Sequence, residues 1–342
     1  MMFVGGPITG KLFDRYGPRY LILTGSFLHV FGLMMTSIST EYYQIILSQG
    51  ICSPIGASLI FYSGMSATGT WFRKNRALAL GVMAAGSSLG GVIFPIMVER
   101  LVDRVGFGWA MRAAAFLILV LLIHANLTVK SRLPPTPKPW SFKEFTDPLK
   151  ELPYFLVVAS SFLFFFGMFL PFNYIILYAE KQGMSQRLAS YLVAILNAVS
   201  IFGRIIPGAI ADRIGRFNTM IVTTFISAAL VLGLWLPSRG NVPIILFMAF
   251  YGFSSGAFVS LAPALIAQIS DIRQIGVRTG TMFAITSVAA LVGNPIGGAL
   301  ITEEHGEYTH LQIFCGIMMV AGACSYVAAR SSLVGAKLWK KI

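Results

Sequence analysis

The chain has 342 residues, of which 56% are hydrophobic and only 11% are charged. A soluble domain of this length would need more charged side chains to cover its surface, so this composition excludes a water-soluble globular protein. The formal net charge is +13, but the basic residues lie in short turns between apolar segments. We expect no nucleic-acid partner, because such a partner needs a basic face on a soluble domain.

Apolar segments of about 20 residues are long enough to cross the hydrocarbon core of a bilayer as helices. In chain order, full-length helices are predicted at 20–39, 42–67, 77–99, 109–129, 152–179, 188–211, 217–236, 242–269, 276–302 and 310–330. This pattern predicts an all-α polytopic membrane protein with about ten complete transmembrane helices. A shorter apolar segment, Met1 to Phe13, precedes them and would rise only about 20 Å as a helix. We therefore expect a partial helix at the N-terminus, from an incomplete gene model or a natural truncation.

The lysines and arginines are distributed unequally over the turns between these helices. Of the 26, 19 lie in alternate turns or in the C-terminal tail, six lie in the opposite turns, and one, Arg204, lies within a helix. Because positively charged loops stay on the cytoplasmic side, this bias predicts a cytoplasmic central loop and C-terminus. The lipid bilayer is the first expected partner, and we favour the plasma membrane.

The longest connection between predicted helices divides the chain. It begins with the proline-rich sequence SRLPPTPKPW, which favours an extended linker. The following SFKEFTDPLKEL is compatible with a short amphipathic helix on the membrane surface. We therefore predict an N-terminal helical half at 1–130, a cytoplasmic linker at 131–151, and a C-terminal helical half with a cytoplasmic tail at 152–342.

One charged turn occurs twice. GKLFDRYGPR begins at Gly10 and GAIADRIGRF begins at Gly208, and both contain Gly, three residues, Asp-Arg, one residue and Gly. Asp14 and Asp212 thus occupy equivalent places, as in a parallel internal repeat. The chain thereby resembles the carriers of the major facilitator superfamily, whose loop between the second and third helices recurs between the eighth and ninth. This resemblance implies the major facilitator fold with two pseudo-symmetric helical bundles, and a chain that lacks the first helix and part of the second.

Each repeated turn could hold the start of a helix from the other half. A carboxylate can accept hydrogen bonds from the free amides of a helix N-terminus, where the macrodipole favours an anion. The pseudo-two-fold arrangement of the family implies that Asp14 meets a helix beginning near Ile275 and that Asp212 meets the start of the 77–99 helix. Such contacts would form a conformational latch; the alternative is a charged turn placed only by topology. The latch would comprise Gly10, Asp14, Arg15, Gly17, Gly208, Asp212, Arg213, Gly215, Arg73 and Arg76.

A second motif narrows the resemblance. WFRKNRALALGVMAAGSSLGGVIFP, from Trp71 to Pro95, resembles the start of the fifth helix in the monocarboxylate-porter family, especially in its fungal members. NAVSIFGRIIPGAIADRIGRFN, from Asn197 to Asn218, is similar to the same branch. The small residues in the first motif alone would be ordinary close packing between membrane helices.

Arg204 is the only strongly ionic side chain deep in a predicted helix. Such an arginine is costly and usually faces a wet cavity or a partner. Asn197, Ser200 and Arg204 are spaced at i, i+3 and i+7, so we expect them on one polar face that binds a substrate carboxylate. The alternative is a structural arginine, paired with backbone carbonyls or with an acid in the missing first helix.

The resemblance adds two further expectations for the substrate pathway. Animal monocarboxylate porters carry an aspartate four residues before the equivalent arginine, whereas Ser200 stands there in this chain. The difference argues against lactate–proton co-transport. Asn173 and Tyr174 lie in the helix that lines the central cavity of this superfamily, so they are candidate substrate contacts, with packing as the alternative.

The sequence contains no His-x-x-x-His pair, no paired carboxylates within a predicted helix and no phosphate-binding Gly-x-x-x-x-Gly-Lys-Ser/Thr loop. We therefore expect no catalytic residue, no cofactor, no metal and no use of ATP. The resemblance implies a secondary transporter, monomeric, that moves a small organic metabolite by alternating access. An organic anion, monocarboxylate-like, or a secondary metabolite is favoured, with export as one direction. The alternative is a truncated non-transporting relic or a regulatory membrane partner of a full-length carrier.

Overall fold

The computed structural model describes residues 1–135, 141–335 and 341. The predicted linker and tail also include 136–140, 336–340 and 342, and these parts of the two predictions lie outside the described residues. Every regular element within the described ranges is helical, with no strand among them. The predicted all-α class is therefore confirmed.

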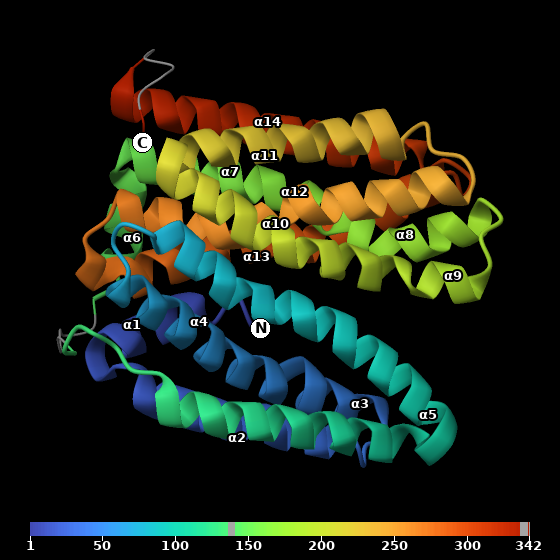
Figure 1. The fold of residues 1–342 in the computed structure, drawn as a ribbon, viewed down its shortest axis with the longest axis horizontal. Coiled ribbons are helices and arrows are strands. Elements are labelled where there is room, and N and C mark those ends of the chain that lie inside the picture. Colours follow the sequence, from blue (N-terminus) through green and yellow to red (C-terminus); the bar gives the residue numbers. More distant parts are fainter. Residues whose placement is uncertain (136–140, 336–340, 342) are drawn as a thin grey trace. The chain divides into compact units, whose positions relative to one another are not determined.

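Helices follow one another along the chain, and most of the connections between them are short (Figure 1). Up to the linker they are α1 (Gly6–Tyr16), α2 (Pro18–Thr36), α3 (Tyr42–Ile45), α4 (Ser53–Trp71) and α5 (Arg76–Thr128). From the linker onward they are α6 (Lys143–Thr146), α7 (Leu152–Met168), α8 (Leu170–Lys181), α9 (Gln186–Ser190), α10 (Leu192–Ile214), α11 (Arg216–Leu230), α12 (Asn241–Gln268), α13 (Ile275–Glu303) and α14 (Thr309–Val334). Two π-helical turns, Ile46–Cys52 and Val231–Trp235, continue α3 and α11.

Eight helical segments of the described chain are long and apolar enough to cross a membrane, so the predicted count of about ten is not reproduced as such. α5 runs through 53 residues and covers both predicted helices 77–99 and 109–129. A kink separates its two parts at Gly106, whose φ of 78° suits glycine. α2 is not among the eight, because polar residues such as Arg19 and His29 lower its mean hydropathy.

The chain forms two compact units, and each combines segments from the two predicted halves. The first unit consists of residues 1–73, 93–146 and 270–284, and the second consists of residues 74–92, 147–269 and 285–342. The beginning of α5 therefore belongs to the second unit, and the beginning of α13 belongs to the first. Boundaries drawn along the sequence, such as the predicted halves 1–130 and 152–342, cannot describe units in which each half contributes a segment to the other.

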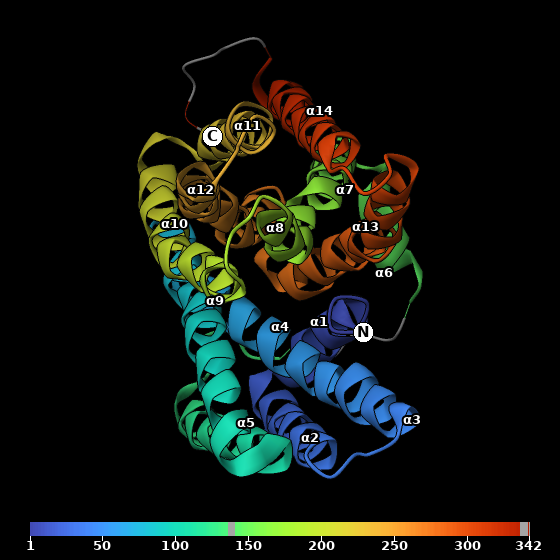
Figure 2. The ribbon, with the colours of Figure 1, turned by 90° about the vertical axis from the view of Figure 1, so that its right-hand side faces the viewer.

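In the first unit, polar side chains join helices that pack along one another. α2 lies beside α4 and beside the last part of α5 (Figures 1 and 2). Asn126 Nδ2 donates to Ser26 Oγ at 2.9 Å, and Arg112 Nε donates to Ser37 Oγ at 3.1 Å. Because lipid chains offer no hydrogen-bond partner, such contacts help to hold membrane helices together.

In the second unit, α7 packs along α14, and α10 packs along α12 (Figure 2). The hydroxyl groups of Ser161 and Tyr326 lie 2.7 Å apart and join the first of these pairs. Trp235 stacks on Phe247, which stacks on Tyr251, and all three are fully buried. This aromatic core fixes α12, the helix against which α10 and its polar residues are placed.

Large apolar side chains remain exposed on both units. Leu291, Val120 and Phe202 are exposed over 75%, 64% and 59% of their surface. Soluble proteins rarely leave extended apolar surface in water, whereas the hydrocarbon core of a bilayer favours it. The described helices therefore form a multi-pass membrane protein.

Candidate functional site

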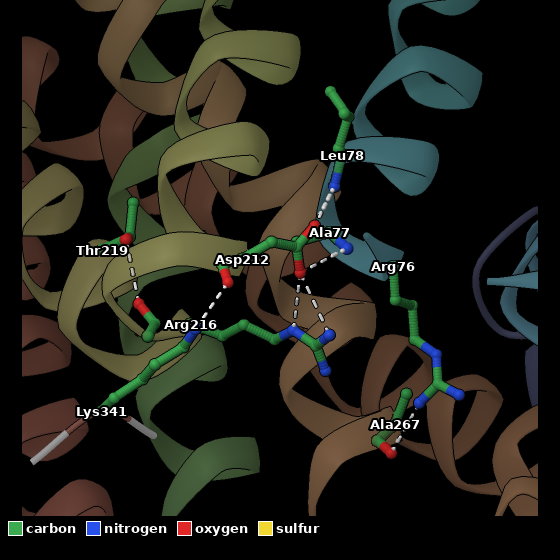
Figure 3. Close-up of polar contacts among 9 residues, drawn as sticks. Arg76, Ala77, Leu78, Asp212, Arg216, Thr219, Ala267 and Lys341 are labelled. Carbon is green, nitrogen blue, oxygen red and sulfur yellow. Dashed lines mark hydrogen bonds and ion pairs between the residues drawn. The ribbon is translucent and has the colours of Figure 1, made fainter. Parts of the chain in front are cut away.

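The Asp212 turn joins α10 to α11 and meets the beginning of α5 (Figure 3). The backbone amides of Ala77 and Leu78 donate to Asp212 Oδ1 and Oδ2, at 3.2 and 2.9 Å. These amides lie in the first turn of α5, where the helix has no carbonyl of its own to accept their hydrogen bonds. The carboxylate therefore caps α5, and the positive end of the helix macrodipole favours its charge.

Arg216 completes the surroundings of this carboxylate. Its Nη2 and Nε donate to Asp212 Oδ1, at 3.1 and 3.3 Å. The side chains of Arg216 and Asp212 are only 12% and 6% exposed. Gly215, with a φ of 113°, ends α10 between them. A buried pair of this kind depends on both partners, since either one alone would leave an uncompensated buried charge.

Further cations border the Asp212 turn. Arg76 Nη1 donates to the Ala267 carbonyl at the end of α12 (3.1 Å), and Lys341 Nζ donates to the Asp212 carbonyl (2.9 Å) (Figure 3). Of the other arginines predicted for the latch, Arg213 is exposed and Arg73 belongs to the first unit. The arginine that the structure pairs with Asp212 is Arg216, which the sequence reasoning missed. Its spacing of four residues from Asp212 was the available signal.

The Asp14 turn joins α1 to α2 and meets the beginning of α13. The Val277 amide, in the first turn of α13, donates to Asp14 Oδ2 at 3.4 Å. Gly17, with a φ of 77°, ends α1, and α2 begins at the next residue. The Arg15 guanidinium lies 5.2 Å from the centroid of the Tyr16 ring. Both aspartates thus contact the helix starts expected from the sequence, and their action as a latch is taken up as a proposal below.

The first helix also contacts the linker. Lys11 is only 4% exposed and forms an ion pair with Glu144 of α6. Both residues belong to the first unit. A lysine so deeply buried beside the Asp14 turn was not anticipated, because the partner lies 133 residues away in the sequence.

Glycines bring α1 and α13 into backbone contact beside Asp14. Gly6 faces Gly280, and Gly10 faces Gly276. A Cβ atom at Gly6 would lie 2.7 Å from the Gly280 carbonyl oxygen, and one at Gly276 would lie 2.7 Å from the Gly10 carbonyl oxygen. Only a residue without a side chain leaves room for this approach. The matching spacings Gly6-x-x-x-Gly10 and Gly276-x-x-x-Gly280 were the sequence signal for this pairing.

Arg204 lies where α10 crosses the beginning of α5. Its backbone is in contact with Gly81, and its Nη1 donates to the Ala84 carbonyl and to the Ser87 hydroxyl. Its Nε is buried and has no hydrogen-bond partner among the described residues. The hydrogen bond to the Ala84 carbonyl agrees with the alternative of a structural arginine that pairs with backbone carbonyls. The Nε of Arg204 remains as a donor that could bind an anion.

The three residues of the predicted polar face do not lie together. Asn197 packs against Gly91 of α5 and donates to the Val193 carbonyl at 2.9 Å. Ser200 is only 2% exposed and packs against Gly256 of α12. A spacing of three residues turns a side chain by about 60° around the helix, which is enough to give Ser200 a different neighbour. Asn197 and Arg204 share α5 as their neighbour, and Ser200 does not.

Asn173 and Tyr174, both on α8, meet the later part of α13. Asn173 Nδ2 donates to Asn294 Oδ1 at 2.7 Å, and the Tyr174 hydroxyl donates to the Asn294 carbonyl at 2.8 Å. Asn173 is exposed, and Asn294 is partly buried. Asn294 was missed, although an amide side chain within an apolar helix is itself a signal of a functional or packing role.

Known proteins match this chain over most of its length. The family model described as "Major Facilitator Superfamily" matches residues 1–248. "MFS-type transporter 1" of an Ophiocordyceps species is 55% identical over 342 residues, which cover all of this chain and 76% of that protein. The fujikurins efflux protein of Gibberella fujikuroi is 43% identical over 330 residues, covering 96% of this chain and 71% of that protein. A crystal structure of the human organic anion transporter MFSD10 (TETRAN) shares the fold, with a TM-score of 0.76 at 17% identity over 95% of this chain and 80% of that chain.

Proposed function

Because this chain belongs to the major facilitator superfamily and is a secondary transporter of a small organic metabolite, we propose that it exports a secondary metabolite by alternating access. A relative named as an efflux protein that matches nearly the whole chain supports this direction. Everted membrane vesicles test it, since an exporter fills them with substrate. Filling of right-side-out vesicles under the same gradient would instead indicate uptake.

The two aspartate contacts support alternating access. In each, a carboxylate accepts from the first turn of a helix that belongs to the other half of the sequence. These hydrogen bonds break when the two helices separate, so they stabilise the conformation in which they are formed. We assign that conformation to a transporter closed on the cytoplasmic side, because the charge bias supports a cytoplasmic position for both turns. Cysteines introduced at positions 103 and 239 should then label from outside intact cells, and labelling at position 14 would contradict the assignment.

We assign the substrate to the organic anions, with Arg204 as the residue that binds it. A guanidinium can hold a carboxylate through two hydrogen bonds, and one buried nitrogen of Arg204 has no partner among the described residues. This unpartnered nitrogen is the observation that carries the assignment. Asn197, two helical turns away on the side that faces α5, and the exposed amide of Asn173 are the further polar groups of the proposed pathway.

Arg204→Lys tests the anion assignment, because lysine keeps the charge and removes the planar arrangement of donors. The variant should raise the apparent KM for carboxylated aromatic compounds about tenfold or more, with normal surface expression. Transport of the neutral amides of the same compounds should change little. Arg239→Lys, at an exposed arginine in a turn, is the matched control. If Arg204→Lys and Arg204→Gln both fail to reach the membrane, or if Arg204→Lys transports like the control, the assignment is wrong.

The alternative of a regulatory membrane partner makes a different prediction. A partner without transport activity of its own would move no substrate when it is reconstituted alone in proteoliposomes. Transport would then require a second carrier in the same membrane. Activity of the purified chain alone excludes this alternative.

A further inference from the structure

Two adjoining cavities in the first unit differ in their chemistry. One, of about 640 Å³, is lined by the turn between α1 and α2, the end of α5 and residues 129–135. The other, of about 490 Å³, is a groove between α2 and the last part of α5. Asn126 and Leu127 line both cavities. We call the first the headgroup pocket and the second the acyl groove.

The headgroup pocket is cationic. Arg19, Lys130 and Arg132 line it, all three are exposed, and none of its described lining residues is acidic. The segment that carries two of these cations is fixed to α4. Trp71 Nε1 donates to the Lys130 carbonyl at 2.8 Å, and the Arg132 amide donates to Thr70 Oγ1 at 3.1 Å. An ordered backbone therefore presents the positive charges to one side of the pocket.

The acyl groove is almost wholly apolar. Its two polar lining residues, Ser26 and Asn126, are hydrogen-bonded to each other at 2.9 Å. Two of its aromatic rings, Phe27 and Phe31, stack with centroids 5.8 Å apart. The other apolar residues that line it are Leu23, Val30, Met34, Leu119, Leu122, Ile123 and Leu127. A groove of this volume falls within the range of ligand pockets, about 300–1,000 Å³.

The dimensions of the two cavities match one leaflet of a bilayer. Leu23 and Met34, the outermost α2 residues of the acyl groove, are eleven positions apart. They therefore span about 16 Å along the helix, which is half of the roughly 30 Å hydrocarbon core. The headgroup pocket lies at the N-terminal end of α2, where Tyr16 and Tyr20 are exposed over 49% and 67% of their surface. Exposed tyrosines are typical of the membrane–water interface.

We propose that the headgroup pocket and the acyl groove together bind an anionic phospholipid. The phosphate of the lipid lies among Arg19, Lys130 and Arg132, and one acyl chain lies along Phe27 and Ile123. The charge of the pocket selects an anionic headgroup over a zwitterionic one. The continuity of the two cavities selects a lipid over a free phosphate ion. The site is separate from Arg204 and does not depend on the proposed function.

Native mass spectrometry of the purified full chain in detergent tests the headgroup pocket, with dioleoylphosphatidylglycerol, dioleoylphosphatidylcholine and inorganic phosphate as probes. The phosphatidylglycerol should be retained in preference to the other two. Each basic residue near a membrane surface contributes about a fivefold change in affinity. The triple substitution Arg19→Gln, Lys130→Gln, Arg132→Gln should therefore weaken phosphatidylglycerol binding about 100-fold. The triple substitution Arg104→Gln, Arg187→Gln, Arg239→Gln, at exposed arginines outside the pocket, should leave it unchanged.

A second pair of variants tests the acyl groove. Ile123→Trp fills the groove, whereas Val120→Trp places the same ring at an exposed position that does not line it. The first should weaken phosphatidylglycerol binding about tenfold, the equivalent of losing two buried methylene groups, and the second should not. Both should elute like the parent protein on gel filtration. Equal retention of the two lipids, competition by inorganic phosphate at lipid concentrations, or equal effects of the two tryptophans would each overturn the proposal.

Discussion

Asp14 and Asp212 occupy the same place in the repeated turn, but the residues around them have diverged. Four residues after Asp212 stands Arg216, which pairs with it, whereas Pro18 stands four residues after Asp14. Eight residues before Asp212 stands Arg204, and the equivalent residue before Asp14 is Gly6. The second copy therefore adds two arginines at positions where the first copy has residues without charge.

This difference shows which features of the repeat are structural. In both copies a carboxylate caps the start of a helix, and a glycine allows the two backbones to approach: Gly10 at α13 and Gly208 at α5. The backbone geometry is thus retained in both copies. The first copy adds a second glycine contact, Gly6 to Gly280, whereas the second copy uses the same position for a guanidinium. A position that one half uses only for packing therefore carries, in the other half, the arginine that we propose as the substrate contact.

The largest expected effect is that of Asp212→Asn. It should lower the free energy of unfolding by about 3–5 kcal/mol, because the substitution removes the buried ion pair with Arg216 together with the charge that caps α5. Chemical denaturation of the purified protein in detergent, followed by tryptophan fluorescence, measures the loss. The double variant Asp212→Asn, Arg216→Gln should lose less than the sum of the two single variants. Strict additivity would show that the ion pair does not cause the difference between the two turns.

The glycine contacts should give an intermediate effect. Gly10→Ala places a Cβ atom against the Gly276 backbone, so α1 and α13 must separate at a cost of about 1–3 kcal/mol. Gly208→Ala should cost less, because its Cβ atom would lie 2.7 Å from the nearest atom, the Ala77 carbonyl oxygen, which is a less close approach than that at Gly10. Gly86→Ala is the matched control, since a Cβ atom there meets open space. Equal stability of the Gly10 and Gly86 variants in the same denaturation experiment would rule out close packing as the reason for Gly10.

Asp14→Asn should have the smallest effect of the three, about 1–2 kcal/mol, at the upper end of interactions with a helix terminus. Pro18 stands where Arg216 stands in the second copy, so Asp14→Asn breaks no ion pair equivalent to the one between Asp212 and Arg216. Asparagine keeps the shape of the side chain and removes its charge. Asp103→Asn, at an exposed carboxylate, should be neutral in comparison. A loss as large as that of Asp212→Asn would mean that Arg216 is not the source of the asymmetry.

Local sequence signals placed several elements well. α13 begins at Ile275, near which a helix start was expected, and α5 begins at Arg76, one residue before the predicted 77–99 helix. Both starts follow charged residues that precede a long apolar run, and this change in composition is visible without the structure. Gly106 lies between the two predicted helices that α5 joins, so the interruption was located although the continuity was not. The finer resemblance to fungal monocarboxylate porters stays a prediction.

The sequence by itself determined the membrane class, most of the helical segments and the repeated turn, because these follow from hydropathy, charge and an internal repeat. The helix starts that the two aspartates meet were implied by the resemblance to the major facilitator superfamily. Only the tertiary structure decided which neighbour each polar side chain contacts. Ser200 meets α12 and Arg204 meets α5, although they lie one turn apart on α10. Asn173 meets Asn294, which is 121 residues away. Helical periodicity fixes the angle at which a side chain leaves its helix, but the crossing of the helices fixes what lies at that angle.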